Sequence, residues 1–526
     1  MHRILIADPL AEAGLEILRQ AGAQIHLLTA EERPRLAEIL PDFDALVVRS
    51  MTRVDAELLA AGRRLKVVGR AGIGVDNVDV TAATDRGILV VNAPTANLIS
   101  ATEHTFALLL ALARNIPAAV NSLAASEWDR KRFMGSELQG KTMGIVGLGR
   151  IGQSVAIRAR AFGMRVVAFD PFLDASAARR LEVDLTDLDE LLATADVVSL
   201  HTPLTDQTRD LLDREHLAKM KQGAVLVNCA RGGIVDEEAL LEALDEGRLS
   251  GAAVDVFAQE PPTGNPLCNH PRVVATPHIG AQTREAQERV ATETARMVLA
   301  ALDGSLAVTA VNLPFVSIGG PGEPYLALGE QLGRLASSLL GGSLLAVRVE
   351  LWGVAEGVRV PTTVAALKGA LTPFLGEAVN FVNAEKVAEE RGIEVVRSIH
   401  HQPSEYSHLV AVRLEGEGGE VEVAGTVFGE KDPRVVSVEN YRLEFRPKGH
   451  LLVVRNRDVP GVVGKLGTLL GEAGVNIAEI HLARQHEGEE AIAVVRLDQE
   501  LTPATLDQVM DISDVTRAQM IDLGGS

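Results

Sequence analysis

The sequence predicts an α/β protein of two doubly wound parallel-sheet lobes, followed by two smaller α+β domains. Short β-branched runs alternate with helical patterns over residues 3–92, and the same alternation begins again near residue 142. A glycine-rich and proline-rich run at residues 317–324 separates these lobes from a region with a different pattern. At 526 residues the chain is too long for one hydrophobic core, which agrees with several domains.

The chain is acidic, with a formal net charge of −20 at pH 7. This balance argues against nucleic acid or an anionic membrane as a partner, and an anionic substrate would need basic residues gathered in one pocket. The two cysteines, Cys229 and Cys268, are too few for a disulfide framework and have no companions at metal-ligand spacing. We therefore expect a cytoplasmic protein that holds no metal. The apolar run after Met1 is too short for a signal peptide, and no segment is long enough to span a bilayer.

Five buried strands are expected in the first lobe, at residues 4–7, 25–28, 45–49, 67–69 and 88–92. Helical patterns separate them, which is typical of a parallel sheet. A long helical pattern over residues 101–125 then leads into the second lobe.

The most informative motif is the glycine turn of residues 147–152, formed by Gly147, Gly149, Arg150, Ile151 and Gly152. It follows an apolar strand at 142–146 and opens a helical pattern that ends near residue 163, the context of a dinucleotide phosphate turn. A second strand at 165–170 ends in Asp170, 18 residues after Gly152 (170 minus 152), where an acid would bind both ribose hydroxyls. Because this carboxylate would repel a 2′-phosphate, we expect NAD rather than NADP.

Four further strands are expected in the second lobe, at residues 196–201, 224–229, 251–257 and 272–276. The helical run at 283–302 that follows could cross back onto the first lobe, which would make the first domain discontinuous. The expected domains are residues 1–97 with 283–311, then 98–282, 312–448 and 449–526.

The C-terminal region contains helices as well as short strands. Residues 325–447 are expected to hold two or three helices, one of them at 362–375, and then four β-rich segments at 394–397, 408–414, 421–428 and 434–445. From residue 450 a strand leads into an amphipathic helix with Val463, Leu466, Leu469 and Leu470 on one face. Further strands and a last helix complete a β-α-β-β-α-β module.

Three polar residues follow strands of the second lobe, at the edge where doubly wound sheets bind ligands: Arg231, Glu260 and His278. A hydride can leave an alcohol carbon only if a base takes the hydroxyl proton, and histidine suits this task near neutral pH. Glu260 would orient the ring, and Arg231 would bind a carboxylate through two parallel hydrogen bonds. The three together predict a 2-hydroxy acid as substrate.

Each of these residues also has a structural interpretation. His278 lies in a Thr-Pro-His-Ile-Gly turn, where a histidine can simply be a satisfied structural residue. Arg231 could be a contact at a helix entry, with Asp236 capping the helix that follows. Glu260 could be a solvated loop acid. For His201 we expect a structural or cofactor-lining role.

Several segments resemble the signature blocks of the D-isomer-specific 2-hydroxyacid dehydrogenases. These are residues 227–237, 253–257 through 260–261, and 276–280, with further support at 48–50, 69–77 and 128–135. The likeness is dense from residue 1 to about 310. It implies a flavodoxin-like substrate lobe and a Rossmann NAD lobe.

The resemblance also implies roles for individual residues. Arg231, Glu260 and His278 would be the catalytic set, and further NAD contacts would come from Thr202, Cys229, Ala230, Asp255, Gly280 and Ala281. The substrate would contact Arg49, Ser50, Arg70, Gly72, Ile73, Lys131 and Arg132. Each basic residue among them could instead be a surface charge, and Arg70 could serve packing between the lobes. The similarity is greatest to members that oxidise 3-phosphoglycerate to 3-phosphohydroxypyruvate, the first step of L-serine biosynthesis.

The last module resembles an ACT domain, a ferredoxin-like regulatory fold, and residues 312–448 resemble the intervening domain of the long form of such enzymes. L-serine is the implied effector, with Asn456, Asp458 and Asn476 as its polar contacts and free amides at the start of the module's first helix. Such modules sometimes serve only assembly, and a homodimer or homotetramer is expected. Two other functions stay open: a glyoxylate or hydroxypyruvate reductase, and a non-catalytic NADH sensor.

Overall fold

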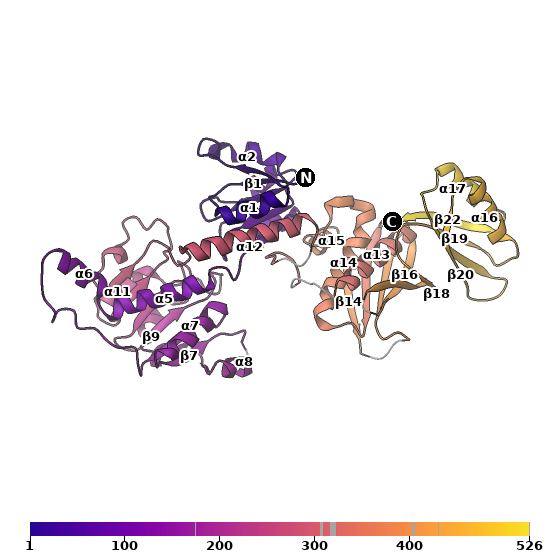
Figure 1. Ribbon diagram of the computed structural model, residues 1–526. Coiled ribbons are helices and arrows are strands. Elements are labelled where there is room, and N and C mark those ends of the chain that lie inside the picture. Colours follow the sequence, from indigo (N-terminus) through magenta and orange to yellow (C-terminus); the bar gives the residue numbers. More distant parts are fainter. Residues whose placement is uncertain (174, 306–308, 316–321, 402–404, 430, 525–526) are drawn as a thin grey trace.

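The computed structural model describes residues 1–526 except 174, 306–308, 316–321, 402–404, 430 and 525–526 (Figure 1). Four sheets follow one another along the described chain, of five, seven, six and four strands. The first two are wholly parallel, and the last is antiparallel. The predicted fold class is therefore confirmed.

The first sheet has the strand order β2-β1-β3-β4-β5, which is the flavodoxin-like order. Its strands are β1 (Arg3–Ile6), β2 (Gln24–Leu27), β3 (Ala45–Val48), β4 (Val67–Arg70) and β5 (Leu89–Asn92). Its helices are α1 (Glu12–Gln20), α2 (Leu36–Ile39), α3 (Ala56–Ala61) and α4 (Val80–Asp85). Separate hydrophobic cores cover the two faces, because successive strand residues such as Leu5 and Ile6 point to opposite sides.

Helix α12 (Arg284–Leu302) returns from the second lobe and packs on α1, β4 and β5 of the first sheet (Figure 1). The helix approaches β4 so closely that a Cβ atom on Gly69 would lie 2.5 Å from the Val298 side chain. After α12 the chain runs beside β5, where Asn312 bonds to the backbone of Ile88 and Val90. The predicted crossing at residues 283–302 therefore occurs.

The second sheet has the order β12-β11-β10-β9-β6-β7-β8, a Rossmann order with one added strand. Its strands are β6 (Thr142–Val146), β7 (Arg165–Phe169), β8 (Asp184–Leu185), β9 (Val197–Leu200), β10 (Val225–Asn228), β11 (Gly251–Val254) and β12 (Val273–Ala275). Its helices are α5 (Leu98–Ala113), α6 (Ile116–Ala124), α7 (Arg150–Ala161), α8 (Ala175–Arg180), α9 (Leu188–Thr194), α10 (Arg214–Lys219) and α11 (Glu237–Asp245). The strand order reverses between β6 and β9, which places a ligand crevice at their carboxyl ends.

The helix predicted over residues 101–125 is in fact two helices. Asn115 takes a left-handed conformation (φ 52°) between α5 and α6, and Pro117 follows in the first turn of α6. Helix α5 packs into the core of the second lobe, whereas α6 is largely exposed. No single described helix passes a test of length and apolar composition for crossing a membrane; the pair α5 and α6 does so together, with a 61° bend between them.

The third sheet has the order β14-β13-β15-β16-β17-β18 and is covered by α13 and α14. Its strands are β13 (Leu344–Trp352), β14 (Glu394–His400), β15 (Leu409–Gly416), β16 (Gly419–Phe428), β17 (Asp432–Val438) and β18 (Tyr441–Phe445), and its helices are α13 (Glu323–Leu340), α14 (Glu356–Leu375) and α15 (Ala384–Glu390). Strand β13 was not predicted, and the segment 434–445 is a hairpin of two strands with Glu439 at φ 47°. Residues 317–321 of the predicted linker lie outside the described residues.

The fourth sheet has the β-α-β-β-α-β order that the sequence predicts. It consists of β19 (His450–Arg457), α16 (Val462–Glu472), β20 (Ile477–Arg484), β21 (Glu490–Leu497), α17 (Pro503–Met510) and β22 (Val515–Asp522). The predicted apolar face of α16 needs one correction, because Val463 is exposed and its neighbour Val462 is buried with Leu466 and Leu470.

Both faces of the fourth sheet are covered. One face packs on α16 and α17, with Leu452 and Val454 in that core. Side chains of the other face, such as Leu451 and Val453, belong to the hydrophobic core of the third sheet. The two C-terminal domains therefore share one core.

Candidate active site

Three glycines shape the turn between β6 and α7. Gly147 has φ 92°, which favours glycine, and a Cβ atom on Gly152 would lie 2.1 Å from the Gly147 carbonyl oxygen. Gly149 precedes α7 without a side-chain cap, and a Cβ atom on it would meet nothing within 4 Å. The space beside Gly149 is therefore open, and the uncapped first turn of α7, with the amides of Arg150 and Ile151, suits a phosphate.

Asp170 lies at the end of β7, beside this turn. Its Oδ2 accepts a hydrogen bond from the Leu148 amide at 2.8 Å, and its Oδ1 accepts one from the Phe172 amide at 2.9 Å. Each carboxylate oxygen keeps a lone pair for a further donor. The carboxylate is therefore fixed where a ribose would follow the pyrophosphate.

The other predicted cofactor residues follow the carboxyl ends of β9 to β12: Thr202, Cys229, Ala230, Asp255, Gly280 and Ala281. The Thr202 hydroxyl is buried and has no hydrogen-bond partner among the described residues. Buried hydroxyls are normally paired, so this one is suited to a hydrogen bond with a bound ligand. Burial is the main cause that raises the pKa of Cys229 to about 12, which leaves it a neutral thiol. The open turn, the fixed acid and this unpaired hydroxyl fit NAD.

His201 precedes Thr202 at the end of β9. Its Nε2 is 2.9 Å from the Ser199 hydroxyl, and burial lowers the pKa of the ring to about 4. The imidazole is therefore neutral at pH 7.

His278 and Glu260 are paired. His278 Nδ1 lies 2.8 Å from Glu260 Oε2, and Glu260 Oε1 accepts a bond from the Phe257 amide at 3.1 Å. Burial, the largest single effect, would raise the pKa of Glu260, but the hydrogen bond and charge of His278 together with the Phe257 amide outweigh it and hold that pKa below its ordinary value. Glu260 is thus ionised at pH 7, and the Nε2 edge of His278 has no described partner.

The loop that carries His278 is held by a buried carboxylate, Asp255, which is 1% exposed. Asp255 accepts hydrogen bonds from the amides of Ile279 and Gly280, both at 2.8 Å, and from the Thr276 hydroxyl at 2.6 Å. His104 of α5 lies 3.1 Å from it and was not predicted. A histidine on a helix of the same lobe gives no local signal that it will meet this carboxylate.

Arg231 lies beside the histidine pair. A Cβ atom on the next residue, Gly232, would be 1.9 Å from the carbonyl oxygen of Phe257, whose amide binds Glu260. The structure therefore brings all three predicted catalytic residues to one edge of the sheet. The Arg231 side chain extends to the first lobe, where its Nε donates to Asp76 Oδ2 at 2.9 Å. Asp236 caps α11, as one interpretation of this segment predicted.

Two further arginines lie on the first-lobe side. Burial, together with the nearby charges of Arg231 and Arg49, lowers the pKa of Arg70 to about 10, so the side chain remains charged at pH 7. Its Nε is buried without a partner among the described residues, and its NH1 reaches only the Ala71 carbonyl at 3.5 Å. A half-buried guanidinium with so few acceptors is suited to an anionic ligand.

Of the remaining predicted substrate residues, Gly72 contacts Arg70, and Ile73 and Ser50 lie on the neighbouring loops of the first lobe. A Cβ atom on Gly72 would be 1.6 Å from Arg70 NH1, and the Ile73 carbonyl accepts a bond from Asn92. Ser50 is exposed and directly follows Arg49.

Lys131 and Arg132 are exposed on the loop after α6, which lies at the outer end of the second lobe (Figure 1). Their described bonds, to Asp129 and Glu127, stay within that loop, and none joins them to a residue that contacts Arg70 or Arg231.

Asn456 and Asp458 lie at the end of β19. Asp458 accepts bonds from Arg484 at 2.7 Å and from the Gly488 amide at 3.1 Å, while Asn456 donates to the Arg457 carbonyl at 2.7 Å. Helix α16 begins after Gly461 without a side-chain cap, as the prediction of free amides requires.

Asn476 does not join the other two predicted effector residues. It precedes β20, whose first residue is in register with Leu497, and Leu497 is in register with His450 at the start of β19. Asn476 therefore lies at the opposite end of the sheet from Asp458. Its side chain is bonded to Asp498 at 2.7 Å.

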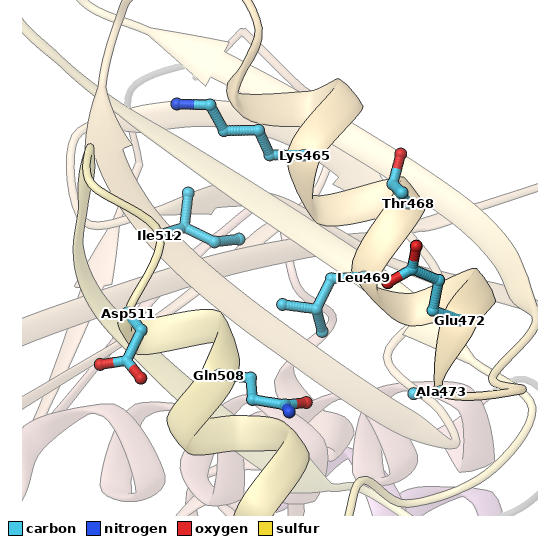
Figure 2. Close-up of a pocket in the computed structure, with 8 residues that line it drawn as sticks. All are labelled: Lys465, Thr468, Leu469, Glu472, Ala473, Gln508, Asp511 and Ile512. Carbon is cyan, nitrogen blue, oxygen red and sulfur yellow. The ribbon is translucent and has the colours of Figure 1, made fainter.

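A hollow of about 730 Å³ lies between α16 and α17 (Figure 2). It is lined by Lys465, Thr468, Leu469, Glu472, Ala473, Gln508, Asp511 and Ile512. None of the predicted effector residues is among them, and the hollow belongs to the C-terminal domain rather than to the two lobes.

Three family models match the chain in succession. They are the D-isomer specific 2-hydroxyacid dehydrogenase NAD binding domain over residues 106–280, the D-3-phosphoglycerate dehydrogenase intervening domain over 323–439 and the ACT domain over 450–514. The glycine turn and the histidine pair thus lie in the NAD-binding domain of an oxidoreductase of this class.

Full-length relatives narrow the class. The chain is 42% identical to D-3-phosphoglycerate dehydrogenase of Methanocaldococcus jannaschii and 41% identical to that of Bacillus subtilis, and each match covers 99% of this chain and 100% of the relative. The chain belongs to the D-3-phosphoglycerate dehydrogenase family. The two lobes are also similar to D-lactate dehydrogenase of Aquifex aeolicus, solved with NAD and lactic acid (TM-score 0.52, 30% identity, 57% of this chain and 96% of that chain).

Proposed function

We propose that this protein oxidises 3-phospho-D-glycerate to 3-phosphohydroxypyruvate with NAD, the first step of L-serine biosynthesis. The observation that carries the proposal is the His278–Glu260 pair at 2.8 Å, beside Arg231 and opposite the half-buried Arg70. A base next to cations on both sides of a cleft suits a hydroxy acid with two anionic groups.

Each residue has a distinct task in this reaction. The terminal nitrogens of Arg231 bind the substrate carboxylate and so orient the hydroxyl-bearing carbon. His278 accepts the hydroxyl proton at Nε2, and the ionised Glu260 at Nδ1 stabilises the imidazolium that forms. NAD, when bound, supplies the hydride acceptor.

The substrate phosphate is assigned to the first-lobe cations. Arg49 and Arg70 supply guanidinium donors, and Arg70 lacks a strong protein acceptor. Lys131 and Arg132 remain proposed contacts, which a conformational change or a second copy of the chain would have to bring to the cleft.

A steady-state assay of NADH formation tests this proposal. The efficiency kcat/KM for 3-phosphoglycerate should exceed that for unphosphorylated D-glycerate by at least about tenfold, because each tenfold corresponds to only about 1.4 kcal/mol of phosphate binding. Equal or better turnover of glyoxylate or hydroxypyruvate in the reverse direction would instead favour a reductase. NADH binding without any turnover would favour a sensor.

We also propose L-serine as effector of the ACT domain, bound between two copies. Strand β20 is an edge strand of a sheet whose faces are both covered, so it is available for pairing with a second copy. Antiparallel pairing of two β20 edges would bring Asn476 of one copy toward Asp458 of the other. Loss of L-serine inhibition in Asp458→Asn, with turnover kept, would support the site; unchanged inhibition would exclude it.

Self-association has a second candidate surface on α6. Ile116, Val120 and Leu123 are 49%, 60% and 60% exposed and follow one face of this helix. A homodimer or homotetramer would cover them. Light scattering should give a multiple of the 56.0 kDa chain mass, reduced in Val120→Glu.

The four-domain division, with boundaries near residues 97, 282, 311 and 448, and a cytoplasmic location are also proposals. The four sheets and the crossing of α12 support the first. The absence of any disulfide between Cys229 and Cys268 is compatible with the second.

A further inference from the structure

We propose that Asp76 is a positioning residue that acts through Arg231, fixing its guanidinium across the cleft so that the terminal nitrogens are left for the substrate carboxylate. The inference rests on the proposed function, in which Arg231 binds that carboxylate. Asp76 lies in the segment 69–77 that supports the family resemblance, but the sequence assigned it no role in the site.

Two of the five N–H donors of the Arg231 side chain are used in hydrogen bonds within the protein. The Nε proton goes to Asp76 Oδ2 at 2.9 Å, and one NH1 proton goes to the Ala230 carbonyl at 2.7 Å. Three donors therefore remain, on NH1 and NH2. One from each nitrogen forms the end-on fork that binds a carboxylate bidentately.

The first lobe is shaped to receive this side chain. A Cβ atom on Gly74 would lie 1.9 Å from Arg231 NH2, so any larger residue there would displace the guanidinium. Gly74 lies in an ordinary backbone region, without a positive φ. Its lack of a side chain therefore serves the approach of Arg231 rather than a turn.

Asp76 itself is held by a rigid loop between β4 and α4. The Asn77 side chain donates to the carbonyls of Arg49 and Thr52, both at 2.6 Å, and the Val78 amide donates to the Val75 carbonyl at 2.8 Å. These bonds fix the backbone on either side of Asp76, while its exposed carboxylate is held by the bond to Arg231. On the second lobe, the Arg231 backbone carbonyl accepts a bond from Asn228.

Charge gives Asp76 a second task. Arg231 and Arg49 both act on Arg70 as like charges, and Asp76 opposes them. Without Asp76, the guanidinium of Arg231 would be repelled from the cleft in the absence of substrate. Its ordering would then have to occur during binding, at a cost in substrate affinity.

The ion pair joins residues 155 positions apart, on opposite lobes, so it forms only when the lobes lie close together. Substrate binding and the relative position of the lobes are thereby coupled. Loss of Asp76 should weaken substrate binding much more than NAD binding, because the glycine turn and Asp170 lie within the second lobe alone.

Kinetics of Asp76→Ala and Asp76→Asn test the proposal. We expect Asp76→Ala to raise the KM for 3-phosphoglycerate about tenfold or more, with a smaller change in kcat and unchanged NAD affinity, and Asp76→Asn, which keeps one acceptor oxygen, to lie between it and wild type. Glu57→Gln removes one negative charge from an exposed position on α3 of the same lobe and should behave as wild type.

A double-mutant cycle shows whether the effect passes through Arg231. In an Arg231→Lys background, Asp76→Asn should cost far less than in wild type. An equal cost in both backgrounds, or Asp76 variants with wild-type KM, would overturn the proposal. If Asp76→Ala loses its fold, as circular dichroism and NAD binding would show, the cycle with Asp76→Asn decides. A wild-type enzyme without activity on 3-phosphoglycerate would overturn the proposed function instead.

Discussion

His278 has a left-handed backbone conformation (φ 53°), which is sparsely populated for residues with a side chain. The bonds from Ile279 and Gly280 to the buried Asp255 hold this conformation. Strain of this kind persists only where the surroundings fix the backbone, and it is typical of functional sites. The geometry of the loop thus supports the role proposed for the imidazole.

Replacement of His278 by alanine should lower kcat for 3-phosphoglycerate by about 10² to 10⁴-fold, because the reaction loses its general base. NAD affinity, measured by quenching of intrinsic fluorescence, should stay near the wild-type value. His216→Ala is the matched control and should keep full turnover, because this ring lies on α10 and pairs with the helix N-cap Asp213. Wild-type kcat in the His278 variant would exclude the imidazole as the base.

The two cysteines should differ in reactivity. Since burial raises the pKa of Cys229 to about 12, its reactive thiolate is scarce until the pH approaches that value. Cys268 is exposed. Treatment of the native protein with iodoacetamide from pH 7 to 9.5 should therefore label Cys268 alone, as peptide mass spectrometry would report. Modification of Cys229 within this range would show that its surroundings open.

At the scale of elements, two substitutions in the glycine turn should have different effects. Gly152→Ala places a Cβ atom 2.1 Å from the Gly147 carbonyl oxygen and should lower the unfolding temperature of the second lobe. Gly149→Ala meets no protein atom within 4 Å and has a permitted φ of −69°, so it should leave that temperature unchanged and weaken NAD binding. Calorimetry with and without NAD would separate the two effects. Equal losses of stability would contradict this division.

Elements with a simple hydrophobic period were predictable, and those set by tertiary contacts were not. The strands of both parallel sheets were located within one or two residues, except β11, which ends at Val254 rather than at 257, and the two-residue β8, which was missed. Strand β13 alternates along its length but lies between two helices, so a helical region was expected there. On α16 the buried valine is Val462 rather than the predicted Val463, because the helix begins directly after Gly461.

In the candidate site, too, only some positions could be predicted from the sequence. The common location of Arg231, Glu260 and His278 could be predicted because the carboxyl ends of parallel strands meet at one edge of a sheet. Asp76 and His104 could not, since their partners come from another lobe or from a distant strand. Only packing of the folded chain brings such residues together.

At the scale of the whole molecule, the shared core of the third and fourth sheets predicts unequal effects of truncation. A chain that ends at residue 448 would uncover core partners of Leu451, Val453 and Ile492, at about 1.5 to 3 kcal/mol for each large side chain. It should unfold at a lower temperature than the full chain and bind a hydrophobic dye. A chain that ends at residue 311 removes that core entirely and should bind little dye. Strong dye binding by the chain that ends at residue 311, without such binding by the chain that ends at residue 448, would contradict the shared core.

The C-terminal half meets the first lobe at one corner. The Asn380 side chain donates to the Gly87 carbonyl at 2.7 Å, Lys386 of α15 pairs with Asp85 of α4, and Asn312 anchors the returning chain on Ile88. The polypeptide connection and the noncovalent contact therefore coincide within a few residues, just after the helix that follows the Asp76 loop. Because these contacts all lie on the first lobe, a displacement of the C-terminal domains would be transmitted to the proposed substrate lobe before it reaches the NAD-binding lobe.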